Sequence, residues 1–156
     1  MITRLSEHFT LAEAITSQEA ARRGIANIPD DVMIVELMKT ATFMEGVRRA
    51  LGSHPIVVTS WYRCEELERV VAGLRPAQKS TGHHPLGAAV DFICPGYGTP
   101  MDIGLRLRGM VDELSIGQLI YEYQRWIHIS RIGVPRPDVN RVITIDIRGV
   151  RSGILA

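Results

Sequence analysis

The longest regular apolar pattern in the chain lies in residues 32–51, where hydrophobic side chains return mainly at intervals of three and four residues. That spacing places them on one stripe of a helix. Asp30 or Asp31 stands where a side chain caps a first turn, and Gly52 follows where a left-handed residue commonly ends a helix. The pattern therefore predicts one long amphipathic helix, which we expect to be the main helix of the core.

Shorter patterns predict the other elements. Thr10-Leu11-Ala12-Glu13 has the form of a capping box, in which two side chains satisfy backbone amides at a helix start. Further helices are expected over residues 17–23, 65–72 and 101–114. β-Branched and apolar runs predict strands over residues 56–60, 88–93, 117–123, 126–130 and 142–147. Residues 73–85 are rich in glycine, proline and polar residues and are expected to form a loop.

The order of these elements indicates the fold class. Helices come first and strands dominate later, which predicts an α+β fold with N-terminal helices packed on a largely antiparallel sheet. A length of 156 residues is typical of one domain, so we expect a single domain over residues 1–156.

Charge and hydropathy exclude several classes of partner. The net charge is +1 and the arginines are scattered, so we expect no nucleic-acid partner. No apolar run approaches the roughly 18 residues that a membrane-spanning helix needs, and residues 1–9 lack the layout of a secretion signal. We therefore expect no membrane partner and a chain that is cytoplasmic on synthesis. Cys64 and Cys94 are expected to be free thiols.

One histidine in the predicted loop, His84, is followed seven residues later by Asp91 on a predicted strand. Zinc favours imidazole nitrogen and carboxylate oxygen, and a catalytic zinc site uses three protein ligands. Gly87 and Ala89 are small and would let the backbone pass close to a metal. His128, inside an apolar strand, is the best candidate for the third ligand. Taken singly, each residue is more simply a hydrogen-bonded or capping side chain, and only the combination favours a metal.

The combination resembles a known family. Its elements are Ser60-Trp61-Tyr62-Arg63, then His84-x-x-Gly87-x-Ala89-x-Asp91, then Glu122 and Trp126-x-His128. In order and spacing they are similar to the M15 family of zinc D,D-carboxypeptidases and endolysin-type peptidases. The resemblance runs from about residue 9 to residue 130 and includes Phe9-Thr10-Leu11-Ala12-Glu13 and Asn27-Ile28-Pro29. It implies a Hedgehog/DD-peptidase-like fold.

The resemblance also implies roles for individual residues. His84, Asp91 and His128 would bind Zn2+, Glu122 would act as general base, and Arg63 would hold a substrate carboxylate. A zinc-bound water loses its proton near neutral pH, and a planar guanidinium matches a carboxylate in two hydrogen bonds. The implied activity is that of a zinc metallopeptidase on peptidoglycan stem peptides. It is either a D,D-carboxypeptidase or an L-Ala-D-Glu type endopeptidase.

Further side chains are expected to contact the substrate, namely Tyr62, Ser80, His83 and Trp126. His83 is expected to line the rim, because His84 keeps the spacing to the aspartate. The predicted strands over residues 117–123 and 126–130 would form a hairpin. A three-residue loop, Tyr123-Gln124-Arg125, would pair Glu122 with Trp126 and turn its side chain to the face of His128. A two-residue loop, Gln124-Arg125, would pair Glu122 with Ile127 and turn its side chain away. We expect the three-residue loop.

Three departures from the family pattern bear on the substrate. Trp61 stands for the usual glycine, Gly82 for the usual serine, and Glu68 for the usual asparagine, which removes an expected polar contact. They leave an alternative function, a non-catalytic cell-wall-binding or virion structural module that retains the fold. Under either function we expect a monomer, and a phage-encoded origin agrees with the resemblance.

Overall fold

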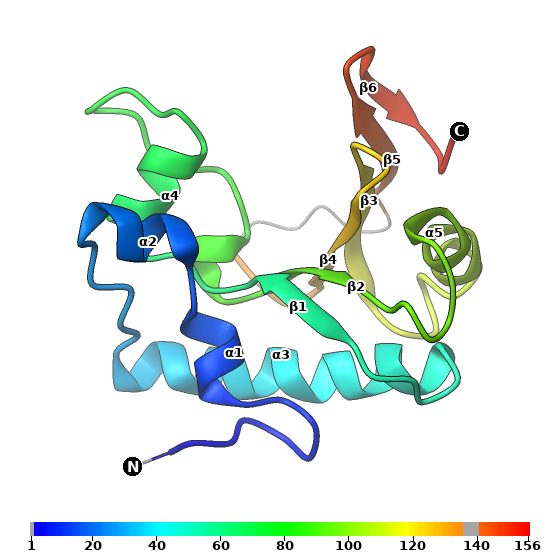
Figure 1. The fold of residues 1–156 in the computed structure, drawn as a ribbon, viewed down its shortest axis with the longest axis horizontal. Coiled ribbons are helices and arrows are strands. Elements are labelled where there is room, and N and C mark those ends of the chain that lie inside the picture. Colours follow the sequence, from blue (N-terminus) through cyan, green and yellow to red (C-terminus); the bar gives the residue numbers. More distant parts are fainter. Residues whose placement is uncertain (1, 136–140) are drawn as a thin grey trace.

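Six strands form one mixed sheet (Figure 1). The computed structural model describes residues 2–135 and 141–156, and within them the strand order is β1-β2-β4-β3-β5-β6. The strands are β1 (Val57–Ser60), β2 (Ala89–Ile93), β3 (Ile116–Glu122), β4 (Trp126–Arg131), β5 (Arg141–Asp146) and β6 (Gly149–Ser152). Neighbouring strands are antiparallel except β3 and β5, which run parallel.

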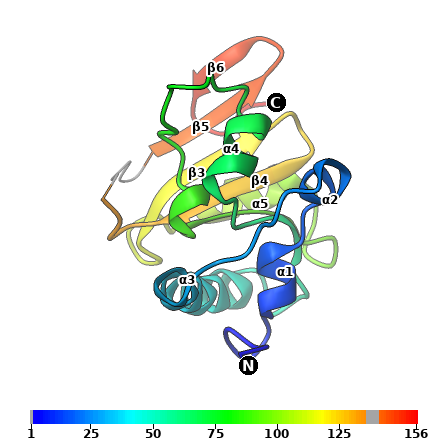
Figure 2. The ribbon, with the colours of Figure 1, turned by 90° about the vertical axis from the view of Figure 1, so that its left-hand side faces the viewer.

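The helices lie on both sides of this sheet. They are α1 (Leu11–Ile15), α2 (Gln18–Arg23), α3 (Asp31–Ala50), α4 (Glu65–Val71), α5 (Pro100–Arg108) and the short 3-10 helix η1 (His84–Leu86). The long α3 runs beneath the sheet, and α4 stands on the other side, as Figures 1 and 2 show. None of the described helices is both long and apolar enough to cross a membrane. The fold is α+β, as predicted.

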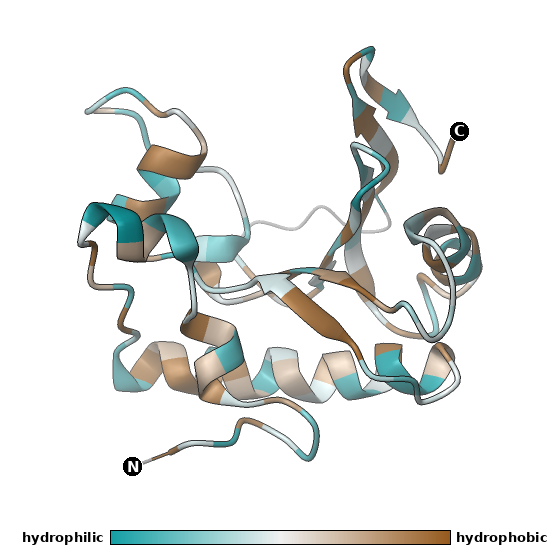
Figure 3. Cartoon of the chain, in the orientation of Figure 1, coloured by the Kyte–Doolittle hydropathy of each residue, from teal (hydrophilic) through white to brown (hydrophobic). Residues whose placement is uncertain are grey.

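Strand alternation gives the sheet an apolar face and a polar face. The core is formed by the apolar face together with one side of α3, in which Leu37, Ala41 and Met44 are fully buried. The strands contribute Val90, Phe92, Leu119, Tyr121, Ile127 and Ile129 to it. Figure 3 shows hydrophobic residues recurring along α3 and the central strands, whereas α2 is largely hydrophilic. The polar face is left for the functional side chains.

The C-terminal third differs most from the sequence prediction. The helix expected over residues 101–114 ends at Arg108, because Gly109 caps it and residues 110–115 form turns. β6 was not predicted, since its four residues are largely exposed and show no alternation of apolar and polar side chains. The chain after β6 then returns to the core, where Ile154 is 4% exposed. Elsewhere, the predicted loop over residues 73–85 ends within η1.

Local hydrogen bonds explain why the N-terminal helices begin and end where they do. Thr10 forms the predicted capping box with Glu13, Ser17 caps α2, and Gly24 ends α2 in the left-handed conformation. Cys64 and Cys94 are free thiols, as predicted.

Gly87 joins η1 to β2. Its φ is 66°, and a Cβ at this position would lie 2.8 Å from Met33 Sδ and 3.2 Å from Leu37 Cδ2 on α3. Its carbonyl oxygen accepts a hydrogen bond of 3.1 Å from Nε1 of the buried Trp61. A side chain here would meet both an unfavourable backbone conformation and close packing.

We expect Gly87→Ala to lower the free energy of unfolding by about 2–5 kcal/mol, because left-handed strain of about 1–2 kcal/mol adds to overpacking of about 1–3 kcal/mol. Gly24→Ala is the matched control, since Gly24 has a φ of 67° and a Cβ there would meet nothing within 4 Å. It should cost only about 1–2 kcal/mol, the strain alone. Urea unfolding followed by circular dichroism measures both, and equal losses would contradict the packing argument.

Candidate active site

Asp91 and His128 lie directly opposite each other on β2 and β4. The distance from Asp91 Oδ1 to His128 Nδ1 is 2.8 Å. His84 approaches the same oxygen from η1, with 3.2 Å between its Nε2 and Asp91 Oδ1. One potential ligand atom from each residue lies within 4.8 Å of the other two, and all three residues are buried. The structure thus brings together the three residues that the sequence predicted as metal ligands.

Each imidazole is oriented by a second hydrogen bond. His84 Nδ1 lies 2.6 Å from the carbonyl oxygen of Trp61, so this nitrogen carries the proton and Nε2 keeps its lone pair. His128 Nε2 lies 3.1 Å from Oε1 of Gln118, which accepts from it, and Nδ1 donates to the Asp91 carboxylate at 2.8 Å. A metal at this point would take the place of the Nδ1 proton. Contacts of this kind fix the tautomer and the ring orientation of metal-binding histidines.

This donor set fits zinc. Two imidazole nitrogens and a carboxylate oxygen bound at about 2.0–2.2 Å in a tetrahedron would be separated by roughly 3.3 Å. The two distances to Asp91 Oδ1, 2.8 and 3.2 Å, are close to that separation. Three protein ligands also leave one coordination position open, which is the arrangement of catalytic rather than structural zinc sites.

The electrostatics of the cluster favour a cation. Burial opposes the ionisation of Asp91, but the charges and hydrogen bonds of His84 and His128 outweigh it and hold the pKa of this carboxyl well below its usual range. Burial also lowers the pKa of His128, yet its hydrogen bond to Asp91 and the charges of Asp91 and Glu122 raise that pKa above the ordinary value. The ionised carboxylate of Asp91 therefore stabilises positive charge on the neighbouring imidazoles, and it would stabilise a metal cation in the same way.

Glu122 stands at the end of β3 on the face that carries His128. It pairs with Trp126 across the hairpin, so the predicted three-residue loop is confirmed. Tyr123 and Gln124 in this loop have φ values of 50° and 60°. Nε1 of Trp126 donates to Glu122 Oε2 at 2.9 Å. Burial is the main cause that raises the pKa of Glu122, and the charge of Asp91 adds to it.

The guanidinium of Arg63 binds two carboxylates, those of Asp91 and Glu68. Its Nη2 donates to Asp91 Oδ2 at 3.0 Å and its Nη1 to Glu68 Oε2 at 3.2 Å. Its Nε donates to Ser60 Oγ at 3.1 Å, and Glu68 Oε1 accepts from Ser80 Oγ at 2.9 Å. The expectation that Glu68 removes a polar contact is therefore wrong, because its longer side chain reaches both Arg63 and Ser80.

The sequence profile described as Peptidase M15 matches residues 7–130. The chain belongs to the peptidase M15 family. A comparison with curated proteins gave no match. The matched segment contains every residue that forms the cluster around Asp91.

One predicted substrate contact of this M15 chain is placed differently from the prediction. His83 is 1% exposed and lies within hydrogen-bonding distance of Ser130 on β4, with 2.8 Å between Nδ1 and Oγ. It does not line the rim, because the turn into η1 directs it into the interior. Tyr62 and Trp126 are half-buried, and the ring centroids of Trp126 and Tyr123 lie 6.1 Å apart. Their contact with substrate stays a prediction.

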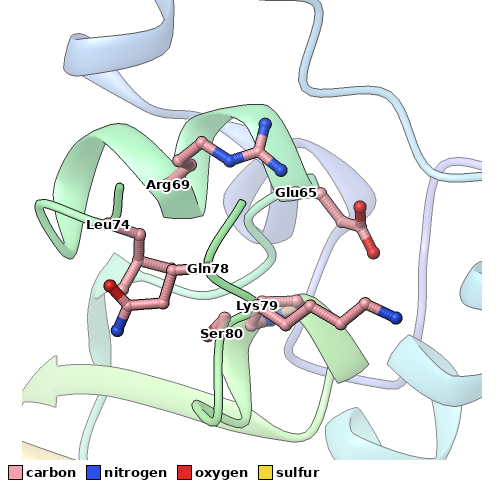
Figure 4. A pocket seen from close by; sticks show the side chains of 7 residues that line it. Glu65, Arg69, Leu74, Gln78, Lys79 and Ser80 are labelled. Carbon is pink, nitrogen blue, oxygen red and sulfur yellow. The ribbon is translucent and has the colours of Figure 1, made fainter. Parts of the chain in front are cut away.

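Two hollows lie on the Arg63 side of the site, and their lining residues include neither a predicted metal ligand nor Glu122. Ser80 lines a small cavity of about 60 Å³ beside α4 (Figure 4), together with Glu65, Arg69, Leu74, Gln78, Lys79 and Pro85. That volume suits only a few atoms. A larger hollow of about 790 Å³ is lined by α1, α2, β1 and α4 and reaches Ser60 and Arg63, and its size is that of a ligand site.

Two residues that hold the site together, Gln118 and Asn27, were not predicted from the sequence to have this role. Gln118 was an unremarked residue of a strand, and nothing in its spacing points to His128. The side chain of Asn27 donates to the carbonyls of Ile15 and Tyr62 and accepts from the amide of Cys64. It ties the N-terminal helices to the segment that carries Arg63. In the sequence, only the similarity of Asn27-Ile28-Pro29 to the family pattern points to this residue.

We expect Gln118→Leu to weaken zinc binding by about 10–100-fold, because it removes the acceptor that orients His128. Titration of the metal-free protein with zinc against a chromophoric chelator measures the affinity. Gln18→Leu, at an exposed position of α2, makes the same chemical change away from the cluster and should leave the affinity unchanged. An unaltered zinc affinity in Gln118→Leu would contradict the orienting role.

Proposed function

We propose that the chain is a zinc-dependent peptidase that hydrolyses a peptide bond in peptidoglycan stem peptides. The observation that carries the proposal is the convergence of three metal-ligand atoms on one point, with the half-buried Glu122 on the same sheet face. Membership in the peptidase M15 family supports the class of reaction. The donor chemistry of two imidazoles and one carboxylate supports zinc.

In this proposal Nε2 of His84, Oδ1 of Asp91 and Nδ1 of His128 would hold the metal. When bound, zinc supplies a Lewis acid and lowers the pKa of a coordinated water towards neutrality. Trp61 and Gln118 keep the two imidazoles in the tautomers that a metal requires.

Glu122 is proposed as the general base that takes a proton from the attacking water and returns it to the departing amine. The Trp126 indole fixes Oε2, so that the carboxylate is held in one orientation. Burial raises its pKa, which strengthens a carboxylate as a proton acceptor. A base of this kind contributes about 10²–10⁴-fold to the rate of proton transfer reactions.

The substrate assignment rests on the family and on the room beside Arg63. The hollow that reaches Ser60 and Arg63 is large enough for an extended peptide. A D,D-carboxypeptidase and an L-Ala-D-Glu endopeptidase would both use the same metal cluster and the same base. The rival function, a wall-binding or virion module without turnover, would keep the metal but release no amines.

We expect Glu122→Gln to lower the rate of amine release from purified peptidoglycan by about 10²–10⁴-fold while zinc stays bound. The reason is that the amide keeps the size of the side chain but cannot accept the proton. Amine release is measured with and without a chelator, and zinc content by elemental analysis.

Glu113→Gln, which removes the same charge at an exposed position, is the matched control and should be fully active. Bound zinc without amine release in the wild-type protein would favour the rival function. Equal activity in Glu122→Gln and wild type would remove Glu122 from the mechanism.

The pH profile gives an independent check. The Trp126 hydrogen bond is one of the influences that lower the pKa of Glu122, so Trp126→Phe should raise that pKa. A base acts only when ionised, so the acid limb of kcat/KM should move to higher pH in Trp126→Phe. Tyr123 lies beside Trp126 but, among the described contacts, donates no hydrogen bond to Glu122. Tyr123→Phe should therefore leave the acid limb in place. A shift to lower pH would contradict the assignment.

A further inference from the structure

We propose that Glu68 withholds Arg63 from the substrate, so that the site does not bind a free carboxylate and cleaves internal peptide bonds. This inference rests on the proposed peptidase function and narrows it to an endopeptidase. In the family resemblance, the arginine was expected to hold a substrate carboxylate. The contacts of Arg63 in this chain assign it to Asp91 instead.

The guanidinium of Arg63 is already engaged on three sides. Its Nε, Nη1 and Nη2 donate to Ser60, Glu68 and Asp91 at 3.1, 3.2 and 3.0 Å. The Arg63 side chain is 15% exposed, and those of Glu68 and Asp91 are 6% and 8% exposed. A bidentate carboxylate needs two adjacent donors on one edge of the guanidinium. Both terminal nitrogens of Arg63 already serve protein carboxylates.

The charges around Arg63 also disfavour binding of a substrate carboxylate. Glu68 and Asp91 place two negative charges beside the single positive charge of Arg63. A third carboxylate would be repelled by both in a site from which water is largely excluded. With a divalent metal bound, the formal charges of the metal, Asp91, Arg63, Glu68 and Glu122 cancel. Asparagine in place of Glu68 would leave this cluster one positive charge, which favours an anionic ligand.

Two departures from the family pattern are linked by this arrangement. A Cβ on Gly82 would lie only 2.8 Å from Glu68 Oε1 and 3.3 Å from Ser80 Oγ. The serine usual at position 82 would therefore displace the glutamate from its contacts. Ser80 itself binds the glutamate, and the amide of Gly82 donates to Ser80 Oγ at 2.9 Å. Glu68 and Gly82 thus form one structural unit, in which the glycine makes room for the longer acid.

Restoring the usual pair tests the inference. We compare the wild type with Glu68→Asn combined with Gly82→Ser, using two stem-peptide pentapeptides that differ only in a C-terminal carboxylate or carboxamide. Calorimetry gives the dissociation constants with zinc-loaded and with metal-free protein, and mass spectrometry gives the cleaved bond. The wild type should bind both peptides within about threefold. The double variant should prefer the carboxylate by at least about tenfold, the value of one charge-assisted contact.

Controls separate this result from other effects. Glu66→Gln removes one negative charge from an exposed position of the same helix and should leave the preference at the wild-type value. Glu68→Gln keeps the size of the side chain and should shift the preference in the same direction as the double variant, should the latter fail to fold. Thermal unfolding and zinc content report the folding of each protein.

The outcomes are distinct for the two proposals. A wild-type preference of tenfold or more for the carboxylate, or no gain in preference in either variant at position 68, would overturn this inference. The same holds if the wild type cleaves only the bond next to a free carboxylate. The expected shift in binding without cleavage of any peptide would instead overturn the peptidase function, because binding is measured without turnover.

Discussion

The burial of the Asp91 carboxylate is the constraint on which the rest of the site depends. An ionised carboxylate that is removed from water costs several kcal/mol unless it is paired and hydrogen-bonded. Asp91 has three partners from three parts of the chain, His84 in η1, His128 on β4 and Arg63 after β1. Each partner is in turn held by another group. The cluster therefore links the helical N-terminal half to the sheet.

Much of the fold follows from local patterns in the sequence. The 20-residue α3, the capping box at Thr10 and five of the six strands were expected from periodicity and turn chemistry. The end of α5 was not, because apolar residues continue at helical spacing past the cap at Gly109, and β6 was not, because its residues show no alternation of apolar and polar side chains. Ile154 packs near Gly104, where a Cβ would lie 3.1 Å from its side chain. No pattern within residues 149–156 carries that information.

The site was predictable where residues repeat a known spacing. His84, Asp91 and His128 were chosen by spacing and resemblance, and the pairing of Glu122 followed from the length of one loop. The partners of these residues were not predictable, because the contact of Arg63 with Glu68 and of Gln118 with His128 is set by side-chain direction. Glu68 stands where the family usually has asparagine, and it was expected to lose a polar contact. Its side chain contacts Arg63 and Ser80 instead, since glutamate is one methylene longer than asparagine.

The parallel pairing of β5 with β3 has a consequence for how the protein can be divided. The family match ends at residue 130, but β5 and β6 continue the sheet beyond it and cover the edge of the strand that carries Glu122. A fragment cut at the limit of the family match would leave that edge with unpaired amides and carbonyls, the usual starting point for self-association. The smallest fragment to express therefore extends beyond the matched segment and includes the β5–β6 hairpin.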